Sequence, residues 1–313
     1  MADYTKLDIK EIHTLLENYD LGTFENVEPL SGGQANSSYK IKTKKGCFTL
    51  SVCDEKTAQE LLTMTRVLKR LSDHNFQSTR LICTTNGEPF VNYQSKPVYV
   101  KEFIDAEVIR DLDGSMLTQV GSAIATLHGI EAPDDLPQAF PYGRTSFDEI
   151  LKSDIDHPFK NWLQKKAVFL DNTLDLSMAK GFIHGDVFWD NLLFKKDRLA
   201  AVLDFEEACH YYLLYDLGMA SVGCCAENGQ FIANKIKALL KGYQISRPLA
   251  DKEKEQFRPF LVYAATAATF WRFRQYNIRY PQAALGDSYQ ELAGLADQAE
   301  SMDKGWYAYF FKD

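Results

Sequence analysis

Several features that define other classes of protein are missing from this 313-residue sequence. Its six cysteines include no C-x-x-C pair, which argues against a structural zinc site. Its most apolar helical stretch, PFLVYAATAATFW, is shorter than the about 20 residues that cross a bilayer. The first residues lack the basic start and apolar run of a secretion signal. We therefore expect a cytoplasmic protein that has no membrane partner.

Positive charge is also in short supply. Lysine and arginine number 35 against 43 acidic residues, which gives a formal net charge of −8. Nucleic-acid binding needs a basic surface that neutralises phosphates, so we expect no nucleic-acid partner. A nucleotide remains possible, because Mg²⁺ and a few backbone amides can hold its phosphates locally. The 45% hydrophobic and 25% charged residues are typical of a folded globular protein.

The pattern of apolar residues changes character after residue 104. Before this point, short β-like runs alternate with turn residues, and helices are predicted over 8–19 and 55–72. After it, the periodicity is helical apart from a short β region over 181–204. The sequence therefore predicts an α+β fold of two lobes, a β-rich lobe over 1–104 and a mainly helical lobe over 105–313.

One polar cluster lies between apolar runs that are typical of strands, in GFIHGDVFWDNLLF and the following RLAAVLDF. Asp186 and Asn191 stand in a D-x-x-x-x-N relation, and Asp204 follows Asn191 by 13 residues. In phosphoryl transfer this spacing supplies an Asp that accepts the hydroxyl proton, and an Asn and a later Asp that hold Mg²⁺. With His184 upstream and a glycine-bearing loop in the β-rich lobe, the pattern indicates a phosphotransferase.

The motifs differ from those of protein kinases. His-Gly-Asp replaces His-Arg-Asp, the metal segment reads Asp-Phe-Glu, and no A-P-E segment follows. The chain resembles the aminoglycoside phosphotransferase and choline kinase superfamily, and within it the kinase-like homoserine kinases. The resemblance covers nearly the whole chain and is carried by YDLGTFENVEPLSGGQANSSYKIKTKKGCFTLSV, FIHGDVFWDNLLF, LDFEEACHYYLLYDLGMA, LLKGYQISRPLADKEKEQF and ATFWRFRQYN.

The resemblance implies a bilobal protein-kinase-like fold that transfers the γ-phosphoryl group of ATP to an alcohol with the help of Mg²⁺. It implies that Asp186 is the catalytic base and that Asn191 and Asp204 are the Mg²⁺ ligands. It further implies that His184 and Asp216 support the catalytic loop. The nucleotide would contact a phosphate loop and the connection between the lobes, at Ser31, Gly32, Gly33, Glu102 and Ile104.

The acceptor site is less closely specified. Trp189 either lines the pocket or wedges the loop against a helix, and Glu206 either binds an amine or is solvated. Arg272 is a candidate for a substrate carboxylate, which a guanidinium binds with two hydrogen bonds. Homoserine is the leading acceptor that the resemblance implies. A choline or ethanolamine kinase, an aminoglycoside kinase and a nucleotide-binding pseudokinase stay open, and the sequence indicates no oligomeric state.

One position departs from the kinase pattern. The third strand of kinases carries a lysine that grips the α- and β-phosphates, whereas the strand here reads CFTLSV and has Ser51 at that position. Homoserine kinases of this type also tend to lack the lysine, so the departure agrees with the resemblance. Lys42 and Lys56 are both candidates for the compensating cation.

Overall fold

The computed structural model describes residues 5–30, 36–54 and 56–311. The chain divides into two compact units, one of Met1–Ala106 with Ala200–Leu203 and one of Glu107–Leu199 with Asp204–Asp313. This division falls two residues after the lobe boundary predicted at 104, and the prediction did not include 200–203 in the first lobe. The expected α+β class is confirmed, since the first unit is rich in β-structure and the second is mainly helical.

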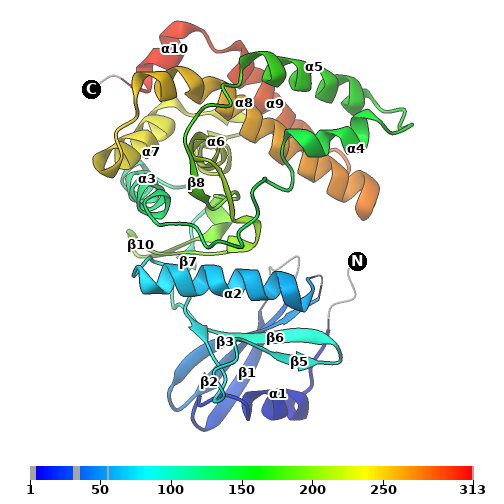
Figure 1. Cartoon of the computed structure of the whole chain (residues 1–313), viewed down its shortest axis with the longest axis vertical. Coiled ribbons are helices and arrows are strands. Elements are labelled where there is room, and N and C mark those ends of the chain that lie inside the picture. The colour runs from blue at the N-terminus through cyan, green and yellow to red at the C-terminus, as the bar shows by residue number, and fades with distance from the viewer. Residues whose placement is uncertain (1–4, 31–35, 55, 312–313) are drawn as a thin grey trace. The chain divides into compact units, whose positions relative to one another are not determined.

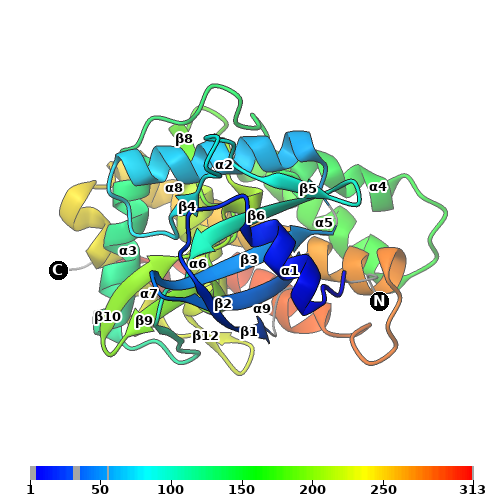
Figure 2. The same ribbon diagram turned by 90° about the horizontal axis from the view of Figure 1, so that it is seen from below.

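The first unit is built on a six-stranded antiparallel sheet. Its strand order is β1-β2-β3-β6-β4, and β5 also pairs with β6. Figure 1 shows α1 and α2 on opposite faces of this sheet, and Figure 2 shows α1 in front of it. The elements are α1 (Ile9–Leu16), β1 (Phe24–Leu30), β2 (Asn36–Thr43), β3 (Gly46–Cys53), α2 (Ala58–Asp73), β4 (Leu81–Ile82), β5 (Val91–Tyr93) and β6 (Lys96–Glu102).

Strand alternation explains how α1 is held. Successive side chains of a strand point to opposite faces, so Leu50 and Val52 of β3 share one face of the sheet. With Val98 and Val100 of β6 they form a buried cluster with the apolar residues of α1. The other face of β3 carries Ser51, which is only 1% exposed. One face of the sheet is therefore a hydrophobic core, and Ser51 is a buried polar residue on the other face.

The rest of the chain holds most of the helices. No helix in the described residues is long and apolar enough to cross a membrane. The elements are β7 (Glu107–Val108), α3 (Gly114–His128), η1 (Arg144–Phe147), α4 (Asp148–Leu151), α5 (Pro158–Thr173), β8 (Lys180–Ile183), η2 (Trp189–Asn191), β9 (Leu192–Lys195), β10 (Arg198–Val202), η3 (Phe205–Glu207), β11 (Cys209–Tyr212), α6 (Leu213–Cys224), β12 (Ala226–Glu227), β13 (Gln230–Phe231), α7 (Ala233–Ser246), α8 (Asp251–Phe273), η4 (Arg274–Arg279), α9 (Tyr289–Ser301) and α10 (Lys304–Tyr309).

Helix α6 lies at the centre of the second unit. Every one of its 12 residues is buried, and it packs against α3, α7 and α8 (Figure 1). Strands β8 and β11 pair antiparallel beside it, and the loop that leaves β8 is the D-x-x-x-x-N segment. A helix buried on all sides is a rigid base, and it carries Asp216 in its first turn.

Helices α3 and α7 approach so closely that their contact requires glycine. A Cβ added to Gly121 would lie 2.0 Å from the Leu239 carbonyl oxygen, and one added to Gly242 would lie 2.0 Å from the Thr118 carbonyl oxygen. Backbone atoms cannot move aside as a flexible side chain can. The two helices can therefore keep this distance only without side chains at these two positions.

We predict that Gly121→Ala destabilises the protein by at least about 1–3 kcal/mol, because the added methyl group forces the helices apart. Gly294→Ala in α9 is the matched control, since a Cβ there meets nothing within 4 Å. This control should stabilise the protein by about 0.5–1 kcal/mol, because alanine restricts the unfolded chain. Urea denaturation of both variants measures the difference, and equal effects would contradict the packing described.

Candidate active site

The loop between β8 and β9 makes a sharp turn before Asp186. Gly185 has a φ of +85°, which lies in the left-handed region, and a Cβ on it would lie 2.8 Å from the Glu207 carbonyl oxygen and 2.9 Å from the Phe140 ring. Neither the backbone conformation nor the space suits a side chain. This turn ends the buried strand and directs the chain into the D-x-x-x-x-N segment.

Asp186 and Asn191 lie in contact, as the phosphoryl-transfer spacing predicts. The Asn191 side-chain Nδ2 donates hydrogen bonds to the Asp186 carbonyl oxygen at 2.9 Å and to Asp186 Oδ2 at 3.0 Å. The turn η2 brings the two side chains together, since the Asn191 N–H also donates to the Phe188 carbonyl oxygen. When a side-chain amide donates through its nitrogen, its oxygen is a separate group that can ligate a cation.

A fully buried carboxylate, that of Asp216, holds the start of this loop. Its Oδ2 accepts from the His184 N–H at 2.8 Å and from His128 Nε2 at 3.1 Å, and its Oδ1 accepts from the Gly185 N–H at 2.8 Å. Burial raises the pKa of Asp216, but the hydrogen bond and charge of His128 and the Gly185 N–H outweigh it and hold the pKa below its ordinary value. The carboxylate is therefore ionised and fixes the two residues that precede Asp186.

His184 completes the support of the loop. Its side chain is buried, and its Nδ1 accepts from the Asp186 N–H at 3.1 Å. The ring of Phe205 lies 4.5 Å from its ring, centroid to centroid. The geometry is that of a residue that braces the loop, which is the role the resemblance implies for His184 and which stays a prediction.

Asp204 stands at the turn that follows β10. It is exposed and has a φ of +58°, in the left-handed region that Asp tolerates better than most residues. Its neighbour Phe205 is buried against His184, so the Asp204 backbone is anchored to the same structure as the catalytic loop. The Glu206 N–H donates to Asp204 Oδ1 at 3.4 Å, and the Asp204 side chain lies at the surface.

Negative charge accumulates around Asp186. Burial, and after it the charges of Asp204, Glu207 and Asp190, together raise the pKa of Asp186 to about 8. No group of three or more His, Cys, Asp or Glu side chains among the described residues is arranged to hold a metal. One carboxylate and one amide oxygen, together with substrate phosphates, are the ligands that suit Mg²⁺. The site therefore fits a divalent cation that arrives with a nucleotide.

The predicted nucleotide contacts fall in the first unit. Ser31, Gly32 and Gly33 lie outside the described residues. The Glu102 N–H donates to the Arg80 carbonyl oxygen at 2.9 Å, and the Ile104 carbonyl oxygen accepts from the Ala106 N–H at 3.0 Å. These backbone groups are therefore already engaged within the unit.

Hydroxyl groups occupy the place of the kinase lysine. Ser51 Oγ is hydrogen bonded to Ser38 Oγ at 2.9 Å, across the β2–β3 ladder. Lys42, one candidate for the missing cation, instead forms an exposed ion pair with Glu25 at 3.2 Å. The sequence pattern did not single out Lys40, whose Nζ lies 4.2 Å from the centroid of the Phe103 ring. Alternation along β2 places Lys40 and Ser38 on one face, so the signal was present.

The two arginines near the end of α8 are already engaged. Arg272 Nη1 donates to the Ser288 carbonyl oxygen at 3.1 Å and lies 3.9 Å from the Glu291 carboxylate. Arg274 Nε donates to Glu149 at 2.6 Å. The sequence pattern did not single out Arg110, whose guanidinium lies over the ring of Trp189, 5.6 Å from its centroid. No signal in the sequence links these two residues.

Aromatic rings gather near the catalytic loop. Trp271 meets Tyr142 edge to face at 6.4 Å between centroids and Tyr276 at 6.2 Å. Burial raises the pKa of Tyr142, and the charge of Glu207 raises it further. Since Glu207 also acts on Asp186, the rings and the reaction centre share an acidic neighbour. Tyr142 is a third residue that the sequence pattern did not single out.

A β-rich unit, a helical unit and the contact of Asp186 with Asn191 in a D-x-x-x-x-N turn are together typical of a phosphotransferase. The chain belongs to the phosphotransferase enzyme family, whose model matches residues 26–249. It is 31% identical over 284 residues to the homoserine kinase of Caulobacter vibrioides (strain NA1000 / CB15N). The aligned region covers 86% of this chain and 88% of that protein. The protein is therefore an ATP-dependent phosphotransferase that acts on the alcohol group of a small molecule.

Solved structures show the same fold at low identity. A spectinomycin phosphotransferase in complex with ADP and spectinomycin superimposes with a TM-score of 0.74 at 14% identity, and covers 95% of this chain and 100% of its own. A microcompartment-associated aminopropanol kinase gives 0.70 at 17% identity, and covers 94% and 97%. These similarities confirm the bilobal kinase-like fold and say nothing of the acceptor.

We predict that Asp216→Asn destabilises the protein by about 2–5 kcal/mol at neutral pH. The amide nitrogen of asparagine is a donor, and it would face an N–H group that now donates to the carboxylate. A carboxyl group whose pKa is lowered in the folded state stabilises that state at pH values above its ordinary pKa, which for Asp is about 4. The difference between the two proteins should therefore be complete above pH 5 and shrink as the pH falls below 4.

Denaturation of both proteins between pH 3 and 8 measures this dependence. Asp197→Asn in the exposed β9–β10 turn is the control and should change little. A destabilisation by Asp216→Asn that is constant across the range would show that charge is not the cause.

Proposed function

We propose that this phosphotransferase transfers the γ-phosphoryl group of Mg²⁺-ATP to the hydroxyl of a small amino alcohol, with homoserine as the leading acceptor. The contact of Asn191 with Asp186, within a concentration of negative charge that a cation would neutralise, is the observation that carries this proposal. The homoserine kinase relative, similar along most of both chains, supports this acceptor.

In the proposed reaction Asp186 accepts the proton of the acceptor hydroxyl. The hydroxyl oxygen forms a bond to the γ-phosphorus as the bond to the β–γ bridging oxygen breaks, and ADP leaves. Asn191 and Asp204 would hold Mg²⁺, which neutralises charge on the phosphates when it is bound. His184 and Asp216 would fix the orientation of the loop through the hydrogen bonds described above.

For the nucleotide, we propose that Ser31, Gly32 and Gly33 cover the phosphates. Glu102 and Ile104 would offer backbone groups to the base. The Glu102 N–H is engaged with Arg80, so the donor proposed for the base is the Ile104 N–H, with the Glu102 carbonyl oxygen as acceptor. This is the arrangement of donor and acceptor that an adenine edge requires.

For the acceptor, we propose contacts with Trp189, Glu206 and Arg272. Glu206 would bind the amine, and Arg272 would bind a carboxylate with the nitrogen groups that Ser288 does not use. A second candidate is a quaternary ammonium alcohol such as choline. It is favoured by the contact of Trp271 with both neighbouring tyrosines, because aromatic faces attract alkylated ammonium groups.

We predict that Asp186→Asn lowers kcat at least about 100-fold, because the variant cannot accept the hydroxyl proton. Acceptor-dependent ADP release measures the rate, and thermal denaturation checks that the variant folds. Asp197→Asn, which changes an exposed carboxylate to an amide, should keep full activity. A folded Asp186→Asn protein that turns over normally would refute the mechanism.

We further predict that homoserine gives the highest kcat/KM in a panel with 3-aminopropan-1-ol, ethanolamine, choline, serine and kanamycin. The aminopropanol is homoserine without its carboxylate, so their ratio measures recognition of that group. Choline as the best substrate would replace homoserine by the second candidate. Binding of Mg²⁺-ATP without turnover of any acceptor would favour a pseudokinase.

A further inference from the structure

The hydrogen bonds that hold Asp216 continue beyond His128 to helix α7. His128 is the last residue of α3, its side chain is fully buried, and its Nε2 donates to Asp216 Oδ2. Its other ring nitrogen, Nδ1, is hydrogen bonded to the hydroxyl of Tyr243 at 2.8 Å. The two rings meet edge to face, with 5.5 Å between their centroids. An imidazole whose two nitrogens are both engaged is held in one orientation toward the carboxylate that it faces.

The close packing of α3 and α7 places Tyr243. Tyr243 is fully buried, and it directly follows Gly242, one of the two glycines at which these helices approach. A Cβ added to Gly121, the other glycine, would lie 2.8 Å from the Tyr243 backbone nitrogen. Arg247, just beyond the end of α7, has its guanidinium over the Tyr243 ring, 5.6 Å from the centroid. Backbone packing and a ring contact therefore fix the hydroxyl beside His128.

Tyr243 provides a directional hydrogen bond without adding charge. Burial raises the pKa of its hydroxyl, which therefore stays protonated and neutral. A second anion beside the buried carboxylate of Asp216 would be costly, because that carboxylate has no water to screen it. A neutral hydroxyl instead holds one side of the imidazole, and the other side of the ring donates to Asp216.

The chain of hydrogen bonds ends at the catalytic loop. Asp216 accepts from the N–H groups of His184 and Gly185. His184 Nδ1 in turn accepts from the Asp186 N–H. If the His128 ring turned, Asp216 Oδ2 would lose a donor, and this is the oxygen that also accepts from the His184 N–H. The direction of Asp186 would change with the loop, and a misplacement of about 1 Å can lower a rate about 100-fold.

We propose that Tyr243 is a positioning residue for phosphoryl transfer, which acts through His128 and Asp216 on the loop that carries Asp186. It touches no substrate, because its side chain is fully buried in the helical unit, with its hydroxyl against His128. The inference rests on the proposed function, since it assumes that Asp186 accepts the proton of the acceptor hydroxyl.

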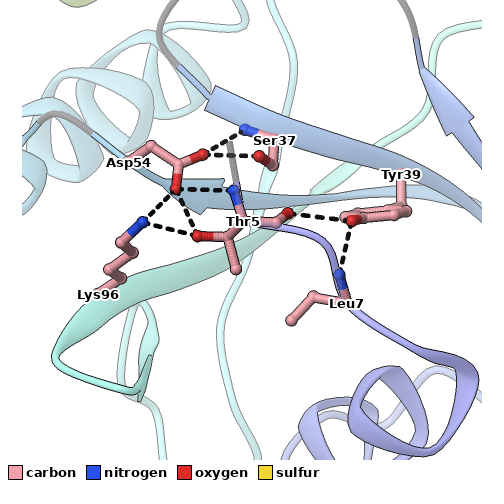
Figure 3. Close-up of polar contacts among 6 residues, drawn as sticks. All are labelled: Thr5, Leu7, Ser37, Tyr39, Asp54 and Lys96. Atoms are coloured by element: carbon pink, nitrogen blue, oxygen red, sulfur yellow. Dashed lines mark hydrogen bonds and ion pairs between the residues drawn. The ribbon is translucent and has the colours of Figure 1, made fainter. Parts of the chain in front are cut away.

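The alternative role of the Tyr243 hydroxyl is to secure α7 against α3 and nothing more. Tyr39→Phe is the matched control, because it also removes a tyrosine hydroxyl that joins distant segments. This hydroxyl accepts from the Leu7 N–H at 2.9 Å and donates to the Thr5 carbonyl oxygen at 3.2 Å, in the segment that Asp54 also holds (Figure 3). These bonds lie in the first unit, whereas the catalytic loop belongs to the second.

The test compares Tyr243→Phe with Tyr39→Phe in the full-length protein, at a temperature at which both are folded. The acceptor is homoserine, or choline if choline is the better substrate. Tyr243→Phe should lower kcat about tenfold, because His128 loses the hydrogen bond that fixes its ring. KM for Mg²⁺-ATP should stay within twofold, because the proposed nucleotide contacts lie in the first unit. Tyr39→Phe should keep both values.

Two further measurements separate a role in positioning the loop from a role in stability. Amide hydrogen exchange at His184 and Gly185, followed by NMR, should be about tenfold faster in Tyr243→Phe, a larger change than at the amides of α8. Tyr39→Phe should leave the two loop amides unchanged. In a protein that already carries His128→Gln, Tyr243→Phe should lower kcat no further, because its effect passes through His128.

Each outcome decides the question. Unchanged kcat in folded Tyr243→Phe would overturn the inference, and so would an equal loss in Tyr39→Phe or an effect that adds in full to that of His128→Gln. If Tyr243→Phe does not fold, His128→Gln takes its place. Unchanged kcat in that variant overturns the inference, and a lowered kcat with unchanged KM for Mg²⁺-ATP supports it.

Failure of the proposed function has a different signature. If the unmodified protein releases no ADP with either acceptor or with the rest of the panel, the proposed function is refuted. The exchange measurement at His184 and Gly185 needs no acceptor, so it still decides whether Tyr243 fixes the loop.

Discussion

The hydrogen bonds to the buried carboxylate of Asp216 are the constraint on which the second unit depends. An ionised group without water costs several kcal/mol unless donors surround it, so the two loop N–H groups and His128 must stay where they are. The buried helix α6 holds Asp216 in place, and Asp216 holds the turn at Gly185. The position of Asp186 is thus fixed by packing that lies behind it.

The first unit uses the same physical device at Asp54. In both cases a carboxylate accepts a backbone N–H from a segment without regular structure, that of Thr5 for Asp54 and that of Gly185 for Asp216. The partner cation differs: a lysine balances Asp54, whereas Asp216 is faced by an imidazole. The directional hydrogen bonds of an ionised acceptor fix a loop more tightly than apolar contacts, because they specify the orientation of each N–H as well as its position.

The relations that could be anticipated from the sequence are local ones. Asp186 and Asn191 are five positions apart, so one short turn brings them together, and alternation or helical periodicity was enough for the two kinds of lobe. Contacts between distant segments left no such trace. Nothing in the sequence pairs Arg110 with Trp189, and the contact of Tyr142 with Trp271 depends on how the turn before η1 approaches α8. Packing of distant elements decides such contacts, and it cannot be read from spacing.

The charge around the reaction centre limits the class of acceptor more than any single contact does. Asp190, Asp204 and Glu207 all raise the pKa of Asp186, so the field there opposes further negative charge. An ammonium group lowers the energy of this arrangement, whereas a carboxylate must be placed beside a cation. Both arginines near the end of α8 already have partners, Arg272 the Ser288 carbonyl oxygen and the Glu291 carboxylate, and Arg274 the Glu149 carboxylate. In the proposed reaction an amino alcohol would therefore suit the site through its amine first, and the carboxylate of homoserine would add a condition that choline and aminopropanol do not impose.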